Sequence, residues 1–350
     1  MNGHRHLDGS DTAGRDLVTG ALGFAGLHLV RDLLRAGREV TGFGKQPDGS
    51  APPTAAGGFS RGPGEGGPEV MYTGPEGSFR YRPGAVDDAD AIREALATAR
   101  PRVIYHLAAQ SSAAASFAAP AETLSANLLG TLNVLEAVRA LPAGERPVVI
   151  AVGSAEEYGP QPGAALLDEE APLTPVSPYA VSKAAQTLLC RQYHRAYGVP
   201  VVVARPFSHT GPGQHPRFAF PSFARQIAAA ESGQGPTEIL TGDLSPVRDF
   251  LDVRDVVRAY RLLADRGRPG EVYNICSGTA LTMAEGLRIL VSAAAVTITV
   301  RRDPSRDRPA DTPRLVGDNR KLRDGTGWVP ERDAASALLD LLAEARKEFS

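Results

Sequence analysis

A tyrosine and a lysine are spaced for acid–base chemistry in the segment YAVSK, which runs from Tyr179 to Lys183. Four residues apart on a helix, the two side chains share one face. The ammonium group there can favour the phenolate and bring a phenol pKa of roughly 10 toward neutrality. Such a pair can move a proton while a hydride moves. The simpler interpretation is a solvated helix face, where Tyr/Lys pairs at this spacing are common.

A glycine-spaced turn lies far upstream, between the apolar run Leu17-Val18 and a helical pattern. Backbone amides and a helix N-terminus at such a turn can meet a pyrophosphate. The turn predicts a dinucleotide site whose contacts are Gly20, Gly23, Phe24, Ala25 and Gly26. A lone glycine triplet is more often an ordinary turn. Because the glycine turn precedes the Tyr–Lys pair in the chain, we favour the interpretation that the two form one site that binds a dinucleotide and moves a proton.

A third segment, GSAEEYG, follows an apolar strand and begins at Gly153. The hydroxyl of Ser154 can hydrogen-bond an oxidisable substrate oxygen and work with Tyr179, and Glu156 could shuttle a second proton. A serine turn with exposed acids is the simpler alternative. The order of the three segments indicates a dehydrogenase-type site.

The bulk composition describes a globular chain. It has 350 residues, 42% of them hydrophobic, and a net charge of -2 without a long basic block, so we expect no nucleic-acid partner. Cys190 and Cys276 stand in apolar contexts without metal-ligand spacing, which predicts no metal site and a cytoplasmic location. No apolar run approaches the ~18 residues that span a bilayer, so we expect no membrane association. Residues 1–14 are predicted to be a disordered tail.

Short β-rich runs alternate with helical patterns, which is typical of a parallel sheet covered on both faces. The predicted strands are 17–19, 39–43, 79–81, 103–107, 148–152, 201–204 and 272–275, and the predicted helices are 91–99, 123–141, 179–197, 248–263 and 334–349. This pattern predicts an α/β fold with a Rossmann-type, doubly wound parallel sheet. Ligands bind at the carboxyl ends of the strands in such folds, where Gly20, Ala108 and Ser154 fall.

The predicted domains are a dinucleotide-binding domain at 15–205 and a smaller substrate-binding portion at 206–350. Residues 248–275 are expected to return to the first domain, so that the two portions interleave. The stretch 46–77 is dense in Gly, Pro and Ser, which predicts a flexible insertion rather than a compact lid.

Together these motifs resemble the extended short-chain dehydrogenase/reductase family, whose members act on nucleotide-sugars. The resemblance covers residues from about Arg15 to Pro330, apart from 46–77. The segments PFSHTGPGQ (from Pro206), RDFLDVRD (from Arg248) and TGW (from Thr326) look most like GDP-4-dehydro-6-deoxy-D-mannose reductases, relatives of GDP-mannose 4,6-dehydratases.

The resemblance assigns roles to individual residues. Ser154, Glu156, Tyr179 and Lys183 match the catalytic set. Leu107, Ala108, Ala109 and His209, with Tyr179 and Lys183, match cofactor contacts. Ser208, Arg248, Arg308 and Asp311 match contacts to the nucleotide-sugar. A guanidinium can grip phosphate bidentately, although Arg248 and Arg308 could instead form surface salt bridges with Asp249 and Asp307. Two departures stand out: Ser208 replaces the family's asparagine, and Ala85 replaces its adenine-contacting acid, with Asp87 and Asp88 nearby as possible substitutes.

The resemblance also implies a cofactor and a substrate. No carboxylate follows the second strand, where Gly44 and Lys45 stand, so NADP(H) is expected ahead of NAD(H). The leading interpretation is NADPH-dependent reduction of a GDP-linked 4-keto-6-deoxyhexose. A 4,6-dehydratase, or another nucleotide-sugar epimerase or dehydratase, is the alternative, and a non-catalytic nucleotide-sensing protein is a third. Surplus apolar positions on helices 123–141 and 179–197 predict a homodimer.

Overall fold

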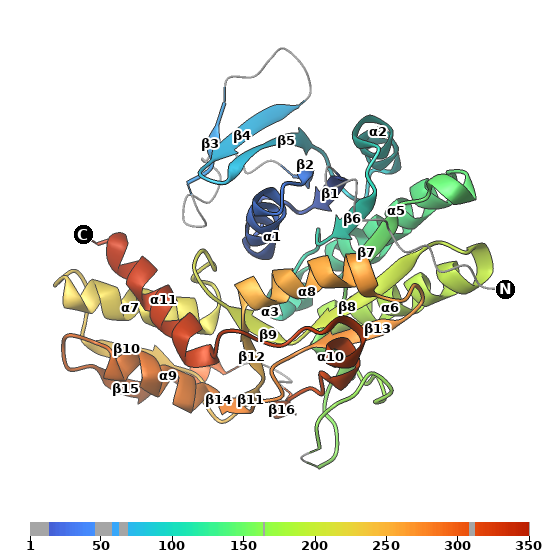
Figure 1. Ribbon diagram of the computed structural model, residues 1–350. Coiled ribbons are helices and arrows are strands. Elements are labelled where there is room, and N and C mark those ends of the chain that lie inside the picture. Colours follow the sequence, from blue (N-terminus) through green and yellow to red (C-terminus); the bar gives the residue numbers. More distant parts are fainter. Residues whose placement is uncertain (1–13, 46–57, 63–68, 164, 308–311, 350) are drawn as a thin grey trace.

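The computed structural model describes residues 14–45, 58–62, 69–163, 165–307 and 312–349 (Figure 1). Within these residues a nine-stranded sheet forms the centre of the larger portion. In spatial order its strands are β13 (Val272–Ile275), β8 (Val201–Pro206), β7 (Val148–Val152), β6 (Val103–His106), β1 (Arg15–Thr19), β2 (Glu39–Gly44), β5 (Gly77–Pro83), β4 (Val70–Gly74) and β3 (Ser60–Arg61). Neighbouring strands from β13 to β5 pair in parallel, whereas β4 pairs antiparallel with β5 and β3 pairs antiparallel with β4. The predicted doubly wound fold is confirmed.

Helices cover both faces of this sheet. Helices α1 (Phe24–Arg35) and α8 (Val253–Arg266) pack on one face, and α2 (Ala89–Ala99), α5 (Gly130–Arg139) and α6 (Pro178–Tyr197) pack on the other. Because successive strand residues point to opposite faces, Leu17 and Val18 of β1 enter two different hydrophobic clusters. The central strands are therefore continuous apolar runs rather than alternating ones.

The predicted helix 123–141 is several elements. It is preceded by α3 (Ala113–Ala118), and the chain then forms α4 (Pro120–Leu124), a π-helical turn (Ser125–Leu129) and α5. The π turn carries Asn127, whose buried side chain donates to the Gln110 carbonyl at 3.1 Å and accepts from the Gln110 amide at 2.8 Å. The apolar pattern of 123–141 does not reveal the π-helical turn, because the contacts of Asn127 there are with Gln110, which lies outside the predicted helix.

The prediction of a flexible insertion at 46–77 is wrong for its final part. Residues 70–74 form β4, which pairs antiparallel with β5. Tyr72 is buried, and its ring stacks on Phe79 at 5.4 Å between centroids, while Phe59 meets Phe79 edge-on. A few well-placed aromatic side chains thus bury enough surface to order a segment of otherwise polar composition. Residues 46–57 and 63–68 lie outside the described residues, as does 1–13 of the predicted tail.

The smaller portion has its own hydrophobic cluster, which includes Phe220, Ile227, Leu290, Leu338 and Leu342. Its helices are α7 (Ala219–Glu231), α9 (Met283–Ser292) and α11 (Ala334–Lys347), whereas α10 (Arg320–Thr326) packs on α8 and β13 of the larger portion. Its strand groups are β10 (Glu238–Thr241) with β15 (Thr299–Arg302); β14 (Leu281–Thr282), β11 (Val247–Arg248) and β16 (Arg314–Leu315); and β12 (Phe250–Asp252) with β9 (Ser208–Thr210). Short 3-10 turns span Ala143–Glu145, Ala155–Tyr158 and Pro304–Arg306.

The two portions interleave because α8 and β13 belong to the layers of the large sheet (Figure 1). The predicted helix 248–263 is wrong at its start, since β11 and β12 precede a helix that begins at Val253. The reason is Asp252, whose carboxylate accepts from the Arg254 amide at 2.7 Å and so caps the helix there.

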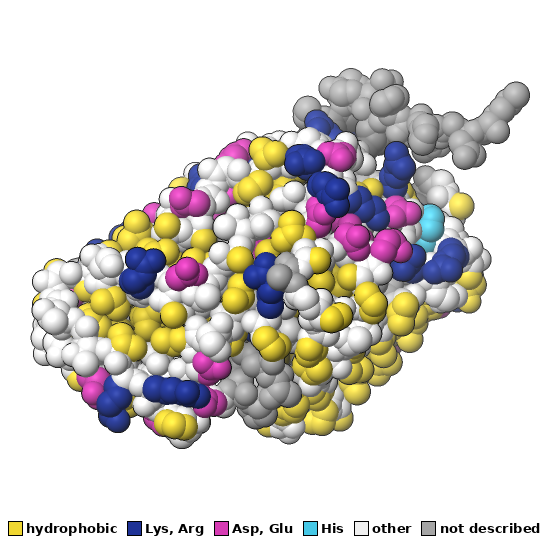
Figure 2. Space-filling model, turned by 90° about the horizontal axis from the view of Figure 1, so that it is seen from below, with side chains coloured by type: hydrophobic (Ala, Val, Ile, Leu, Met, Phe, Trp, Pro, Cys, Tyr) yellow, Lys and Arg dark blue, Asp and Glu magenta, His cyan; other side chains and the backbone are white. Residues whose placement is uncertain are grey.

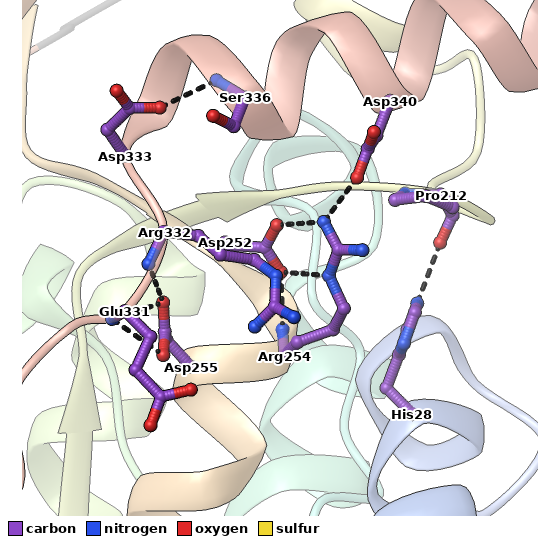
Figure 3. A network of polar contacts seen from close by, with 10 residues as sticks. All are labelled: His28, Pro212, Asp252, Arg254, Asp255, Glu331, Arg332, Asp333, Ser336 and Asp340. Atoms are coloured by element: carbon purple, nitrogen blue, oxygen red, sulfur yellow. Dashed lines mark hydrogen bonds and ion pairs between the residues drawn. The ribbon is translucent and has the colours of Figure 1, made fainter.

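Figure 3 shows polar contacts that join α11 and the loop after β9 to α8 and α1, the two helices on one face of the large sheet. Arg254 of α8 binds Asp252 and also Asp340 of α11. His28 of α1 bonds the Pro212 carbonyl at 2.8 Å. The loop that follows Ser208 and His209 therefore rests against the helix that begins at the glycine turn.

On the face that Figure 2 shows, basic and acidic side chains are intermixed, with hydrophobic side chains between them. Among the described residues, no helix combines the length and the apolar character needed to cross a membrane.

Candidate active site

The predicted site residues meet at the carboxyl edge of three neighbouring strands. Gly20 follows β1, Ala108 lies just beyond β6, and Ser154 lies just beyond β7, and these strands are adjacent in the sheet. Parallel pairing brings their carboxyl ends to one edge, so segments far apart in sequence share one site.

The glycine turn is shaped by close backbone approach. Gly20 has φ +73°, and a Cβ added there would lie 2.9 Å from the Ala108 amide nitrogen. A Cβ on Gly26 would lie 2.1 Å from the Gly20 carbonyl oxygen. Helix α1 starts after Gly23 without a side-chain cap and without an acidic residue in its first turn. Its amide groups and dipole thus suit an anion, and the turn fits the pyrophosphate of a dinucleotide.

Thr19 and His106 hold β1 and β6 together directly beneath this turn. The Thr19 hydroxyl bonds His106 Nδ1 at 2.8 Å and also accepts from the Ala108 amide at 3.2 Å. His106 Nε2 bonds the Thr131 hydroxyl at 3.1 Å, and burial lowers the pKa of His106 to about 3. His106 is therefore a neutral, packed histidine, and Leu107, Ala108 and Ala109 continue from it along the cleft edge.

Two further predicted cofactor contacts flank the turn. The rings of Phe24 and His209 stack, with centroids 6.0 Å apart and planes 7° from parallel. Lys45 lies beyond β2 with its side chain exposed, and its carbonyl accepts from the Tyr81 hydroxyl at 3.0 Å. His209 thus links the loop after β9 to the first residue of α1.

Tyr179 is buried, and the Ser154 hydroxyl is its hydrogen-bonding neighbour. Burial raises the pKa of the Tyr179 phenol, the Ser154 hydrogen bond opposes that rise, and the charges of Glu156 and Glu157 add to it. The expected shift of this pKa toward neutrality is therefore wrong for the structure. The phenol is held in its protonated form.

Lys183, the other half of the predicted pair, has an ammonium group with partners of its own. Nζ donates to the Val152 carbonyl at 2.8 Å and to Gln186 Oε1 at 2.9 Å, and Gln186 Nε2 donates to the same carbonyl at 3.2 Å. Burial lowers the pKa of Lys183 to about 8, while the charge of Glu157 opposes that fall. The ammonium group is anchored to the end of β7, one turn of helix from Tyr179.

The start of α6 is fixed by hydrogen bonds from the opposite side. Ser177 caps the helix, and the Tyr179 amide donates to the Ser116 hydroxyl at 3.1 Å. The Ser182 hydroxyl donates to the Tyr179 carbonyl and accepts from Asn127 at 2.8 Å. These contacts set the direction in which the phenol points.

The two glutamates after Ser154 differ in environment. Glu156 is half-buried, and its charge acts on Tyr179. Glu157 is fully buried and accepts from the Ser154 amide at 2.8 Å. The sequence analysis assigned no role to Glu157, although Ser-Ala-Glu-Glu carries the S-x-x-E spacing of a capping box that could have revealed it.

On the substrate side, Ser208 of β9 pairs with Phe250 of β12, two residues after Arg248. Asp249 is occupied by backbone groups, accepting from the amides of Ser277 and Gly278 at 2.7 and 2.8 Å. Arg308 and Asp311 lie outside the described residues. Asp87 and Asp88 were possible substitutes for the adenine-contacting acid that Ala85 replaces. In the structure Asp88 caps α2, and Asp87 accepts from the Ser125 hydroxyl.

Comparison with known proteins agrees with this geometry. A family model described as GDP-mannose 4,6 dehydratase matches residues 17–340. GDP-6-deoxy-D-mannose reductase from Pseudomonas aeruginosa is 41% identical over 245 residues, which cover 70% of this chain and 80% of that protein. dTDP-glucose 4,6-dehydratase from Streptomyces antibioticus is 34% identical over 328 residues, covering 92% and 89%.

Among solved structures, RMD from Pseudomonas aeruginosa complexed with NADPH has a TM-score of 0.76 and 33% identity, covering 95% of this chain and 99% of that one. The chain belongs to the GDP-mannose 4,6-dehydratase family, within the extended short-chain dehydrogenases/reductases. The predicted family is confirmed, and so is the prediction of an NAD(P)-dependent enzyme.

Proposed function

We propose that this protein uses NADPH to reduce the 4-keto group of a GDP-linked 4-keto-6-deoxyhexose. The observation that carries the proposal is the buried Tyr179 phenol beside Ser154, at the edge of the sheet where Gly20 and Ala108 also lie. A reduction needs a proton donor at the substrate oxygen, and a protonated phenol is one. The 41% identity to GDP-6-deoxy-D-mannose reductase supports the choice of substrate.

Ser154, Tyr179 and Lys183 have different roles in the proposed reduction. Ser154 donates a hydrogen bond to the ketone oxygen, and Tyr179 gives that oxygen its proton as it becomes a hydroxyl. NADPH held at the glycine turn would supply the hydride for carbon 4. Lys183, held by Val152 and Gln186, keeps a positive charge beside the phenol and favours its anion once the proton has left.

Substrate contacts follow from the smaller portion. Arg248 and Ser208, on neighbouring strand segments, would meet the nucleoside diphosphate, and Arg308 and Asp311 are proposed from their motif. A guanidinium matches phosphate bidentately, which suits Arg248 to this role. Lys45, exposed beyond β2, would meet the 2'-phosphate that distinguishes NADP(H) from NAD(H).

A 4,6-dehydratase is the second candidate, and Glu156 favours it. Its charge acts on Tyr179, so a second acid–base group belongs to the same site. In that reaction Glu156 would help to expel water across carbons 5 and 6.

Two assays separate the candidates. The first supplies GDP-mannose without a reductant, and the second supplies the 4-keto-6-deoxy sugar with NADPH. We expect NADPH consumption and a new hydroxyl in the second assay. Keto-sugar formation in the first assay, without NADPH consumption in the second, would make the protein a dehydratase.

We also propose a homodimer through α6 and the segment that leads into α5. Leu129 and Leu188 are 49% and 59% exposed, and Phe117, Leu124 and Val181 are also exposed. Val134, Leu135 and Val138, which were counted as surplus in the sequence, are buried against the chain's own sheet. Light scattering should give twice the monomer mass at micromolar concentration, and a monomer would contradict the proposal.

A further inference from the structure

A fully buried ion pair lies directly behind the catalytic serine. Glu157 is 0% exposed and Arg205 is 2% exposed. Arg205 donates to Glu157 Oε2 from Nη2 at 2.9 Å and from Nε at 3.2 Å. Taking two charges out of water is costly, and a buried pair is weak evidence of a purely stabilising role. Its other contacts show what the pair holds in place.

The carboxylate of Glu157 joins three elements of the site. Oε1 accepts from the Ser154 amide at 2.8 Å, and Oε2 accepts from the Thr187 hydroxyl of α6 at 2.8 Å. A Cβ on Gly153 would lie only 2.4 Å from Oε1, so the glycine makes room for the carboxylate. The end of β7, the start of the 3-10 turn and the helix that carries Tyr179 therefore meet at one side chain.

Arg205 extends the arrangement to the rest of the turn. Its Nη1 donates to the Tyr158 hydroxyl at 2.8 Å, and its guanidinium lies 4.7 Å from the centre of the Tyr158 ring. The Tyr158 hydroxyl donates in turn to Asn274 of β13 at 2.8 Å. Both ends of the turn that contains Glu156 are thus tied to the sheet.

We infer that Glu157 and Arg205 are positioning residues that hold the Ser154 backbone, and with it the hydroxyl, in register with Tyr179. The inference rests on the proposed catalytic role of Ser154. The charge of Glu157 also acts on both Tyr179 and Lys183, which places the carboxylate within electrostatic reach of the acid–base pair.

The test compares two neutral double variants, because a single Glu157 variant would leave Arg205 buried and unpaired. Neutral replacement of a buried pair by groups of similar volume is often tolerated. Glu157→Leu with Arg205→Met removes the acceptor for the Ser154 amide, whereas Glu157→Gln with Arg205→Met retains it. We expect the leucine variant to lose about 10- to 100-fold in kcat with little change in KM, since misplacement by about 1 Å can cost that much. The glutamine variant should recover most of that loss.

Hydrogen–deuterium exchange of the peptide containing the Ser154 amide gives a readout that does not depend on turnover. Exchange should quicken in the leucine variant and return toward the wild-type rate in the glutamine variant. Gly153→Ala keeps the ion pair but pushes Oε1 away from the amide, so it tests the same contact if neither double variant folds. It should reproduce the faster exchange and the lower kcat.

Asp16→Asn is the control, since the buried Asp16 carboxylate pairs with the partly exposed Arg38 at the opposite edge of the sheet. It should lower stability without lowering kcat. Wild-type kcat and wild-type exchange in a folded leucine variant, or in Gly153→Ala, would overturn the inference. Wild-type turnover by Ser154→Ala would instead contradict the proposed role of the serine, which separates the two failures.

Discussion

Each edge of the central sheet buries a carboxylate that pairs with an arginine, but Arg38 at one edge is partly exposed and Arg205 at the other is buried, and the two pairs have different neighbours. At the amino edge, both oxygens of Asp16 accept from Arg38, at 2.7 and 2.9 Å, and the pair joins β1 to the start of β2. At the carboxyl edge, Glu157 binds Arg205 and also the amide of Ser154. The first pair connects strands, whereas the second also holds a side chain that we assign to catalysis.

The difference follows from the direction of the strands. Parallel strands end together at one edge, so the loops there converge, while the opposite edge collects the turns that bring the chain back. A substitution at the carboxyl edge should therefore change binding or turnover, and one at the amino edge should change stability alone. The following predictions test that distinction.

The largest effect is expected at Tyr179. Tyr179→Phe removes the proton donor and should lower turnover about a hundred- to ten-thousand-fold, the usual contribution of general acid–base catalysis. Lys183→Ala should lose most turnover as well. Steady-state kinetics with NADPH and the keto sugar measures both, and cofactor binding should survive Tyr179→Phe. Near-normal turnover by that variant would remove Tyr179 from the mechanism.

A smaller effect is expected at Gly26, in the first turn of α1. Gly26→Ala places a Cβ against the Gly20 carbonyl at 2.1 Å and should weaken NADPH binding by about 10- to 100-fold, as overpacking typically costs about 1–3 kcal/mol. Gly37, with φ +72° and no atom near its Cβ position, is the control at the amino edge. Gly37→Ala should cost about 1–2 kcal/mol of stability and leave the binding constant unchanged. Equal affinities in the two variants would contradict the assignment of the turn.

The pH dependence should report Lys183. Burial lowers its pKa to about 8 in the fold, against an ordinary value of 10.5. We expect kcat/KM to fall as pH rises through about 8, because the positive charge is lost. Between these two pKa values the unfolded chain binds one more proton than the folded chain, so the unfolding free energy rises with pH. Denaturant unfolding should show this rise in the wild type but not in Lys183→Met. The same dependence of the unfolding free energy on pH in both proteins would contradict the lowered pKa of Lys183.

The smallest effect is expected at Lys45. Lys45→Ala removes an exposed charge and should weaken NADPH binding only a few fold, in line with about 0.2–1 kcal/mol for exposed ion pairs. NADH binding should stay the same, since it lacks the 2'-phosphate. Fluorescence titration with NADPH and with NADH measures the ratio of the two dissociation constants. A wild-type protein that binds NADH more tightly than NADPH would refute the proposed preference.

The fold class, the glycine turn and the candidate set of Ser154, Tyr179 and Lys183 could all be predicted from local patterns in the chain. Local spacing suffices for these features, because periodicity sets the elements and parallel pairing brings strand ends to one edge. Strands 148–152 and 272–275 have the bounds that the sequence predicts.

The sequence does not reveal which charged side chains are buried or which partners they bind, and the tertiary structure shows both. Glu157 and Arg205 are 48 residues apart in the chain, and the Lys183 ammonium group donates to the Val152 carbonyl and to Gln186. Likewise, Tyr72 orders β4 through contacts with Phe79 and Tyr81 that composition alone does not reveal. Burial and long-range pairing depend on how the elements pack, and a local pattern carries no record of that packing.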